Sequence, residues 1–273
     1  MLYEYRFDGI YIRHAIDDCP DDKNFIMHIH DQFEIYFFIT GNVEYLVEGS
    51  KYPLKDGTLM IMRPAESHKP SIIGDERYER YAVHFSRELV TSIDPEGILT
   101  KAFTERPLGK GNMLLPHEFD TEAVLRLFVD MCADNDDYSK RLTIKTHLFM
   151  LLHLISRAYS ASADQTLSNR QLGISERIIS YTNKHLFDDI SIPQLARRFY
   201  LSSSQFARIF KGATGATPWE YITKKRLTAA KEKIKSGTPA RKASEECGFK
   251  DYSAFYRAYV KHFGYSPRGD GEH

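Results

Sequence analysis

Four polar side chains in the first quarter of the chain have the types and spacing of a metal-binding or polar-ligand site. His28, His30 and Glu34 stand at even positions of one segment, and His68 follows later in the chain. Imidazole nitrogens and a carboxylate are suitable ligands for a divalent metal. The same groups can also donate and accept hydrogen bonds to a hydroxylated small molecule.

The segment that carries the first three of these residues alternates in polarity with a period of two. Odd-numbered apolar residues from Ile29 to Ile39 share one face, and the two histidines, the glutamate and Tyr36 share the other. This alternation predicts a β-strand with one face toward a core and the other toward a lumen or solvent. Tyr36, together with Arg63 five residues before His68, is therefore a further candidate for contact with a ligand.

A second set of side chains, near the C-terminus, is suited to contact with DNA. It combines serine, glutamine, tyrosine, arginine and lysine, which can hydrogen-bond base edges and phosphates. The set falls on two segments of helical periodicity, each with aromatic residues on the opposite face. The candidate DNA-contacting residues are Ser203, Ser204, Gln205, Arg208, Lys211, Tyr252, Ser253, Tyr256, Arg257 and Lys261.

These two segments belong to an internal near-repeat, in which Phe206 and Phe255 occupy equivalent positions. Each copy contains a short helical segment, a tight turn, an N-cap residue (Ser202 or Asp251) and a second helical segment. This is the pattern of a helix-turn-helix unit. Between the copies, the stretch 217–220 has the sequence of a capping box with proline at the first helical position, and it predicts a long connecting helix.

Charge is divided unequally along the chain. The 273 residues carry 37 basic and 37 acidic side chains, whereas residues 174–273 hold 18 lysines and arginines against 10 acidic residues. A basic segment favours contact with a polyanion. The three dispersed cysteines predict neither a disulfide framework nor a zinc knuckle, and the first 20 residues do not have the pattern of a signal peptide. We therefore expect a cytoplasmic protein without membrane contact.

The segment from about Ser175 to Arg268 resembles the DNA-binding domain of the AraC/XylS family of bacterial transcription regulators. The matching residues are Leu195, Ala196, Phe206, Arg208, Phe210, Lys211, Thr214, Gly215, Pro218, Tyr221, Arg226, Leu227, Ala230, Gly248, Phe249, Ser253, Phe255, Arg257, Gly264 and Pro267. The resemblance implies that the second helix of each unit enters a major groove of double-stranded DNA. It also implies a small-molecule effector, with a sugar or related carbon source as the expected class, and RNA polymerase as a further candidate partner.

The spacing His28-x-His30-x3-Glu34-x6-Gly41 resembles the first motif of the cupin barrel, and Gly57 followed by His68 resembles the second. In cupin enzymes these residues bind a metal. Three hypotheses stay open: a metal-dependent enzyme, a metal-containing sensor, and a metal-free sensor whose histidines and glutamate bind a small ligand or each other. A polar strand face in contact with solvent is a fourth. We favour the metal-free sensor because fused DNA-binding domains usually accompany sensors.

We therefore expect an α+β protein of two domains, without enzymatic activity, cofactor or resident metal. The predicted parts are a cupin-like effector-sensing β-barrel over 1–116, a helical dimerisation segment over 117–160, a linker over 161–173, and a DNA-binding domain with two helix-turn-helix units over 174–268. A stripe from Ile144 to Tyr159 at helical spacing is too apolar for a fully exposed helix. We expect part of it to pack on the barrel and the helix pair also to meet its counterpart in a homodimer. The other histidines, His84 among them, show no ligand spacing.

Overall fold

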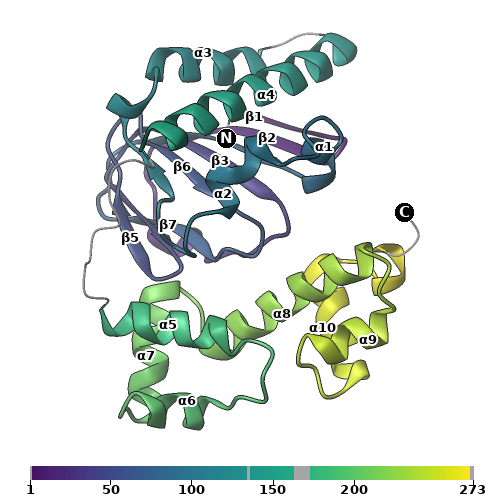
Figure 1. The fold of residues 1–273 in the computed structure, drawn as a ribbon. Coiled ribbons are helices and arrows are strands. Elements are labelled where there is room, and N and C mark those ends of the chain that lie inside the picture. The colour runs from purple at the N-terminus through teal and green to yellow at the C-terminus, as the bar shows by residue number, and fades with distance from the viewer. Residues whose placement is uncertain (1, 134–135, 163–172, 271–273) are drawn as a thin grey trace.

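The computed structural model describes residues 2–133, 136–162 and 173–270. They form a β-rich N-terminal part and an all-helical C-terminal part (Figure 1). Most of the linker predicted over 161–173 lies outside the described residues, and helix α4 continues to Ser162 before it. None of the described helices is both long and apolar enough to cross a membrane.

The β-rich part contains two sheets with antiparallel pairing throughout the described residues. The larger sheet has the order β1 (Tyr3–Phe7), β2 (Ile10–Asp17), β8 (Tyr78–Phe85), β3 (Phe33–Thr40), β6 (Leu59–Met62) and β9 (Met113–Leu114). The smaller sheet has the order β5 (Ser50–Pro53), β4 (Val43–Val47) and β7 (His68–Ile72). An apolar interior with residues from both sheets lies between them, as expected for a small barrel or sandwich.

Strand β3 shows the predicted alternation from Phe33 onward. The predicted start at Ile29 is wrong, because residues 29–32 precede the strand and Ile29 packs against the C-terminal helices instead of sharing a core with Phe33. Phe33, Ile35 and Phe37 belong to the core outside the barrel, whereas Tyr36 and Phe38 belong to the interior between the sheets. All five side chains are buried. Since successive strand residues point to opposite faces, the same alternation places Glu34 on the interior side.

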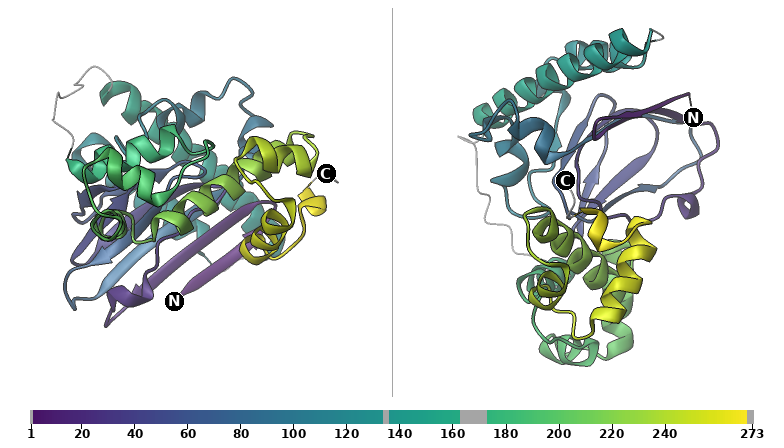
Figure 2. Two further views of the ribbon diagram at one scale, coloured as in Figure 1. Left: turned by 90° about the horizontal axis from the view of Figure 1, so that it is seen from below. Right: turned by 90° about the vertical axis from the view of Figure 1, so that its right-hand side faces the viewer.

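Two helices cover the outer face of the larger sheet, on the side of the barrel away from the helical domain (Figures 1 and 2). They are α3 (Thr121–Met131), capped by the Asp120 side chain, and α4 (Asp137–Ser162). The predicted stripe on α4 is buried against this sheet, with Ile144, Leu148 and Leu151 at 0% exposure. The stripe therefore packs inside the chain, because the outer sheet face needs an apolar cover.

Short helices connect the larger elements of the β-rich part. They are α1 (Arg87–Thr91), α2 (Lys101–Thr104), and the 3₁₀ turns η1 (Asp22–Asn24), η2 (Ile98–Thr100) and η3 (Pro116–Glu118). Of these, α2 contributes Ala102 and Phe103 to the core beneath α4.

The C-terminal part consists of two helical units joined by a long helix. The first unit contains α5 (Ile174–Lys184), α6 (Ile192–Arg198) and α7 (Ser203–Thr214), and α8 (Pro218–Lys235) follows. The second unit contains α9 (Ala240–Glu246), α10 (Tyr252–Phe263) and the 3₁₀ turn η4 (Pro267–Asp270). The predicted caps are confirmed: Ser202 accepts a hydrogen bond from Gln205 N, Asp251 from Ser253 N, and Thr217 from Glu220 N.

Candidate effector site and DNA-binding faces

The structure brings the predicted polar residues of the barrel together around one carboxylate. Glu34 on β3 is only 3% exposed, and its Oε2 lies 2.9 Å from His68 Nε2 and 3.1 Å from His30 Nε2. One ligand atom from each of His28, His30, Glu34 and His68 lies within 4.8 Å of the others. The four residues therefore form a compact site at one end of the barrel interior.

Backbone carbonyls fix the orientation of the three predicted histidines. The Nδ1 atoms of His28, His30 and His68 lie 3.1, 3.0 and 2.7 Å from the carbonyl oxygens of residues 26, 32 and 66. A ring nitrogen that donates to a carbonyl leaves the lone pair of the other nitrogen free. For His30 and His68 that nitrogen is Nε2, which faces the Glu34 carboxylate. Two acceptors at this distance need a proton or another cation between them.

The charges within the cluster follow from burial and from this geometry. Burial alone would raise the pKa of Glu34, but the neighbouring His84 and His68 hold it well below its usual value. Burial opposes protonation of His68, yet the Glu34 carboxylate raises the pKa of that imidazole. Burial lowers the pKa of His28 to about 3, and His68 adds to this effect. The site thus pairs a buried carboxylate with one imidazole that favours the proton.

His84 is a fifth member of the cluster that sequence reasoning missed. Its Nε2 lies 3.5 Å from Glu34 Oε2, and its ring centroid is 4.7 Å from that of His30. Burial lowers the pKa of His84 to about 3. The placement follows from the pairing of β3 with β8, in which His84 is opposite Glu34. The pairing of two strands 50 residues apart cannot be predicted from sequence spacing. The alternation of side chains along β8 gives only a weak indication of which of them face the interior.

The other two predicted ligand residues have their polar atoms engaged elsewhere. The Tyr36 hydroxyl lies 2.5 Å from the Tyr78 hydroxyl in the barrel interior. The Arg63 guanidinium donates to the carbonyl oxygens of residues 104 and 106, at 3.2 and 3.1 Å. Neither residue has a hydrogen bond to the Glu34 cluster in the described part of the chain. Tyr36 still lines the interior next to Tyr45, whose ring stacks 6.3 Å from His68.

The ten candidate DNA-contacting residues lie on two helices with accessible outer faces. In α7, Phe206 and Phe210 are fully buried, whereas Arg208 and Lys211 are exposed. In α10, Phe255 and Tyr259 are buried and the candidate polar residues are exposed, except for the half-buried Tyr252. Both helices therefore present a polar, basic face, as a helix that enters a major groove must.

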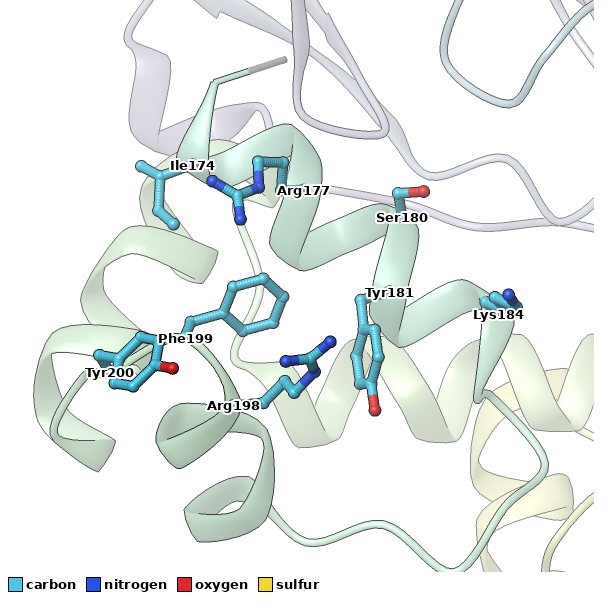
Figure 3. A pocket seen from close by; sticks show the side chains of 8 residues that line it. All are labelled: Ile174, Arg177, Ser180, Tyr181, Lys184, Arg198, Phe199 and Tyr200. Atoms are coloured by element: carbon cyan, nitrogen blue, oxygen red, sulfur yellow. The ribbon is translucent and has the colours of Figure 1, made fainter. Parts of the chain in front are cut away.

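A basic pocket of about 440 Å³ lies between α5 and the turn before α7 (Figure 3). Arg177 and Lys184 line it from α5, and Arg198 lines it from the end of α6, with its guanidinium 5.6 Å from the Tyr181 ring. Within the described ranges, none of these three cations has an ion-pair partner. The pocket adds to the positive charge of the first helical unit.

Comparison with protein families gives two matches that together span most of the chain. The family described as the AraC-like ligand binding domain matches residues 13–152. A helix-turn-helix domain family matches residues 195–269. The first match begins within β2 and covers the rest of the two sheets and much of α4. The second begins within α6 and covers the rest of the helical part.

Curated relatives are transcription regulators. The HTH-type transcriptional activator RhaS of Escherichia coli O139:H28 is 24% identical over 269 residues, which span 93% of this chain and 90% of RhaS. The probable transcriptional regulator LumQ of Photobacterium leiognathi is 36% identical over 91 residues. That alignment covers 33% of this chain and 37% of LumQ.

Solved structures with similar folds include ToxT from Vibrio cholerae, with 10% identity and a TM-score of 0.39 over 96% of this chain and 97% of ToxT. The DNA-binding domain of AdpA, in complex with a target DNA, has 23% identity and a TM-score of 0.33. It covers 34% of this chain and 85% of the AdpA chain.

Proposed function

The chain belongs to the AraC-like family of regulators, and on that premise we propose how its parts divide the work. It is a DNA-binding transcription regulator with an N-terminal ligand-binding domain. Residues 1–116 sense the effector, 117–160 mediate dimerisation, 161–173 link the domains, and 174–268 read DNA. Because it acts on DNA, it works in the cytoplasm, with RNA polymerase as a candidate partner.

The effector we propose is a hydroxylated small molecule of the sugar class, bound at the Glu34 cluster. The observation that carries this proposal is the convergence of one carboxylate and four imidazoles above an aromatic interior. Such a site offers donors and acceptors on several sides next to apolar ring faces. A hydroxylated ligand could replace the hydrogen bonds that these groups make with one another. An apolar ligand that separated them would leave them unpaired, at about 1–3 kcal/mol each.

Binding of the effector can be tested with a panel of sugars and polyols. A ligand that binds only the folded chain raises the midpoint of thermal unfolding. Glu34→Ala should abolish this shift and the effector response, yet leave basal DNA binding intact because Glu34 lies in the other domain. Glu44→Ala is the matched control, since that carboxylate pairs with Lys51 on the smaller sheet. If both Glu34→Ala and His68→Ala respond like the parent, the cluster is not the effector site.

A divalent metal is the second candidate occupant of the same cluster. Four potential ligand atoms lie close together, and the Nδ1 atoms of His28, His30 and His68 face backbone carbonyls, as is common for metal-binding histidines. Elemental analysis of the purified protein, with Glu34→Gln as control, decides between the two occupants. Stoichiometric metal in the parent alone would favour a metal sensor. If the metal-loaded protein also converted a small molecule to a product, the result would instead favour an enzyme fused to a DNA-binding domain.

The dimer we propose forms through the outer face of α3 and α4. A groove of about 1050 Å³ runs between α1, α3 and α4 and is lined by apolar side chains such as Leu127, Phe149 and Leu154. Met150, which lines the groove, and Leu142 on the same helix are each 55% exposed. Exposed apolar surface of this kind usually marks an interface. The face lies away from the helical domain (Figure 2), so a second copy there would leave both DNA-binding domains free.

A further inference from the structure

The short segment 26–31 lies between the Glu34 cluster and the DNA-binding domain and contacts both. Its even residues, His28 and His30, belong to the cluster. Its odd residues Met27 and Ile29 are each 4% exposed and belong to the apolar core of the first helical unit, together with Phe206 of α7. Alternate side chains of this short segment therefore point in opposite directions. Two histidines point into the cluster, and two apolar side chains point into the other domain.

Backbone hydrogen bonds also connect this segment to the part of the barrel that carries His68. His28 N donates to His68 O at 3.1 Å, and His68 N donates to His28 O at 3.2 Å. Ala65 N donates to His30 O at 2.8 Å. A displacement of segment 26–31 would therefore move two imidazoles of the cluster and disturb the backbone that carries a third.

Two ion pairs continue the contact between the domains. Asp31, the last residue of the segment, lies 2.8 Å from Lys231 Nζ on α8. Glu48, in the turn after β4, lies 2.5 Å from Lys225 Nζ, and these two side chains are 1% and 5% exposed. The Tyr221 hydroxyl also donates to Glu48. A buried charge without its partner strongly destabilises a protein. The pairing of Glu48 with Lys225 therefore stabilises the contact between the two domains.

The backbone itself is close at this contact. Gly49 has φ +81°, and a Cβ atom there would lie 2.2 Å from Ile179 Cδ1 of α5. The positive φ favours glycine at this position, and the close neighbour is the terminal methyl group of the Ile179 side chain. Figure 1 shows α5 and the start of α8 beside the end of the barrel that carries β5 and β7. The apolar, ionic and backbone contacts thus act at one surface.

We propose that segment 26–31 couples occupancy of the Glu34 cluster to docking of the DNA-binding domain. The inference rests on the proposed function of the cluster as a binding site and adds how its occupancy is transmitted. The docked domain fixes Met27 and Ile29, and so holds His28 and His30 in place for a ligand. When the DNA-binding domain undocks, segment 26–31 becomes free to move. A ligand of the Glu34 cluster must then order this segment as it binds, which lowers the affinity for the ligand. By linkage, a bound ligand favours docking by the same factor.

The test uses the full chain, Zn²⁺ as the probe, and variants in the DNA-binding domain alone. The double variant Lys225→Met/Lys231→Gln removes the two cations of α8 that form the shortest ion pairs across the contact. Lys235, 3.5 Å from Glu88 and 3.9 Å from Asp31, is left in place. Lys233→Gln is the matched control, because that lysine lies on the same helix but pairs with Glu246 inside its own domain. Tyr221→Phe is a milder variant that removes only the hydroxyl donated to Glu48. Zn²⁺ binding at other sites is subtracted with Glu34→Gln.

Two measurements decide the outcome. Calorimetry should show Zn²⁺ affinity at least about fivefold weaker in the double variant, less reduced in Tyr221→Phe, and within about twofold of the parent in Lys233→Gln. Hydrogen exchange should show slower exchange of the α5 and α8 amides in the parent when Zn²⁺ is bound. A double variant that undocks by hydrogen exchange but binds Zn²⁺ like the parent would overturn the coupling.

If the parent does not bind Zn²⁺ at all, the coupling is tested without a ligand. Glu34→Gln perturbs the cluster, and it should speed exchange of the α5 amides in the other domain. Glu44→Gln, which removes a carboxylate that pairs with Lys51 on the smaller sheet, should leave them unchanged. Equal exchange in both variants would refute the coupling, whereas failure of Zn²⁺ binding alone would bear only on what the cluster binds.

Discussion

At the scale of single residues, three buried carboxylates connect segments that are distant in the sequence. Glu34 is surrounded by imidazoles. Glu48 accepts a hydrogen bond from the backbone N–H of Ser67 in its own domain and also pairs with groups of the other domain. Glu66 is bound by Arg106, Asn112 and the backbone N–H of Gly109. Each is at most 5% exposed. A buried charge is tolerated only where several donors replace its water, so each carboxylate marks a point where different segments must meet.

Glu66 lets this be tested through pH. Burial alone would raise its pKa, but the hydrogen bonds and charge of Arg106 lower it to about 2. Its stabilising effect is therefore complete above the unfolded pKa near 4.5 and is lost as pH falls toward 2. Glu66→Gln should lower the free energy of unfolding by about 3 kcal/mol at pH 7. The difference from the parent should shrink between pH 4.5 and 2 in urea titrations.

The control for this experiment is Glu245→Gln, since that carboxylate is exposed and pairs with Arg241 within one helix. Its effect should stay within about 0.5 kcal/mol. A difference between parent and Glu66→Gln that is independent of pH would show that the pair with Arg106 does not set the stability.

Arg208 is the residue of α7 that we expect to contribute most to DNA recognition. It is exposed, opposite the buried Phe206 and Phe210. Arg208→Ala should weaken specific DNA binding by about 1–3 kcal/mol if the guanidinium reads a base edge. The measurement is a gel shift on a selected duplex and on an unrelated one, with Lys250→Ala as a control for lost charge. Unchanged affinity and sequence preference would exclude Arg208 from the interface.

At the scale of elements, α4 has one apolar face and an outer face of mixed polarity with exposed apolar side chains. One face covers the larger sheet with fully buried side chains such as Ile144 and Leu148. The other carries Leu142 and Met150, which protrude into solvent. Exposed apolar side chains on the outer face of a packed helix suggest contact with a partner.

The outer face of α4 should therefore control the oligomeric state. Leu142→Asp/Met150→Asp should convert a dimer to a monomer in sedimentation at tens of micromolar, because two carboxylates would be buried without partners. Ile26→Asp, at a residue of the barrel that is 73% exposed and not on these helices, should stay dimeric. A chain ending after Ala161 should also dimerise. A monomeric parent chain would contradict the prediction.

At the scale of the whole molecule, α8 sets the relation between the two DNA-reading units. It is 18 residues long and capped at its start by Thr217, which corresponds to roughly 27 Å of helix. The first unit shares its core with Met27 and Ile29 of the barrel, whereas the core of the second unit contains only C-terminal residues. The barrel therefore contacts one unit extensively, and α8 carries the other.

This rigid connection predicts a fixed spacing in the DNA site. Two units on one straight helix read successive major grooves on the same side of the duplex, about 10 base pairs apart. Insertion of about 5 base pairs between the two halves of a selected site should reduce affinity to that of a half site, because the second groove then faces away. An insertion in the flanking DNA is the control. Equal affinity for both duplexes would mean that the two units move independently.

The sequence by itself determined the local structure and the kind of protein. Period-two alternation in β3 predicted which side chains face the interior, and the caps at Ser202, Thr217 and Asp251 predicted where helices begin. The spacing of His28, His30, Glu34 and His68 predicted a shared site. These features depend on neighbours within a few residues, or on motifs with a fixed spacing, and so they are visible in a linear sequence.

Only the tertiary structure decided which distant segments meet. His84 joins the cluster because β8 pairs with β3, Arg63 instead binds carbonyls near Arg106, and the stripe of α4 packs on the larger sheet. The contact of segment 26–31 with α8 likewise joins residues about 200 positions apart. Such contacts depend on strand pairing and on the packing of complete surfaces, which no local pattern encodes.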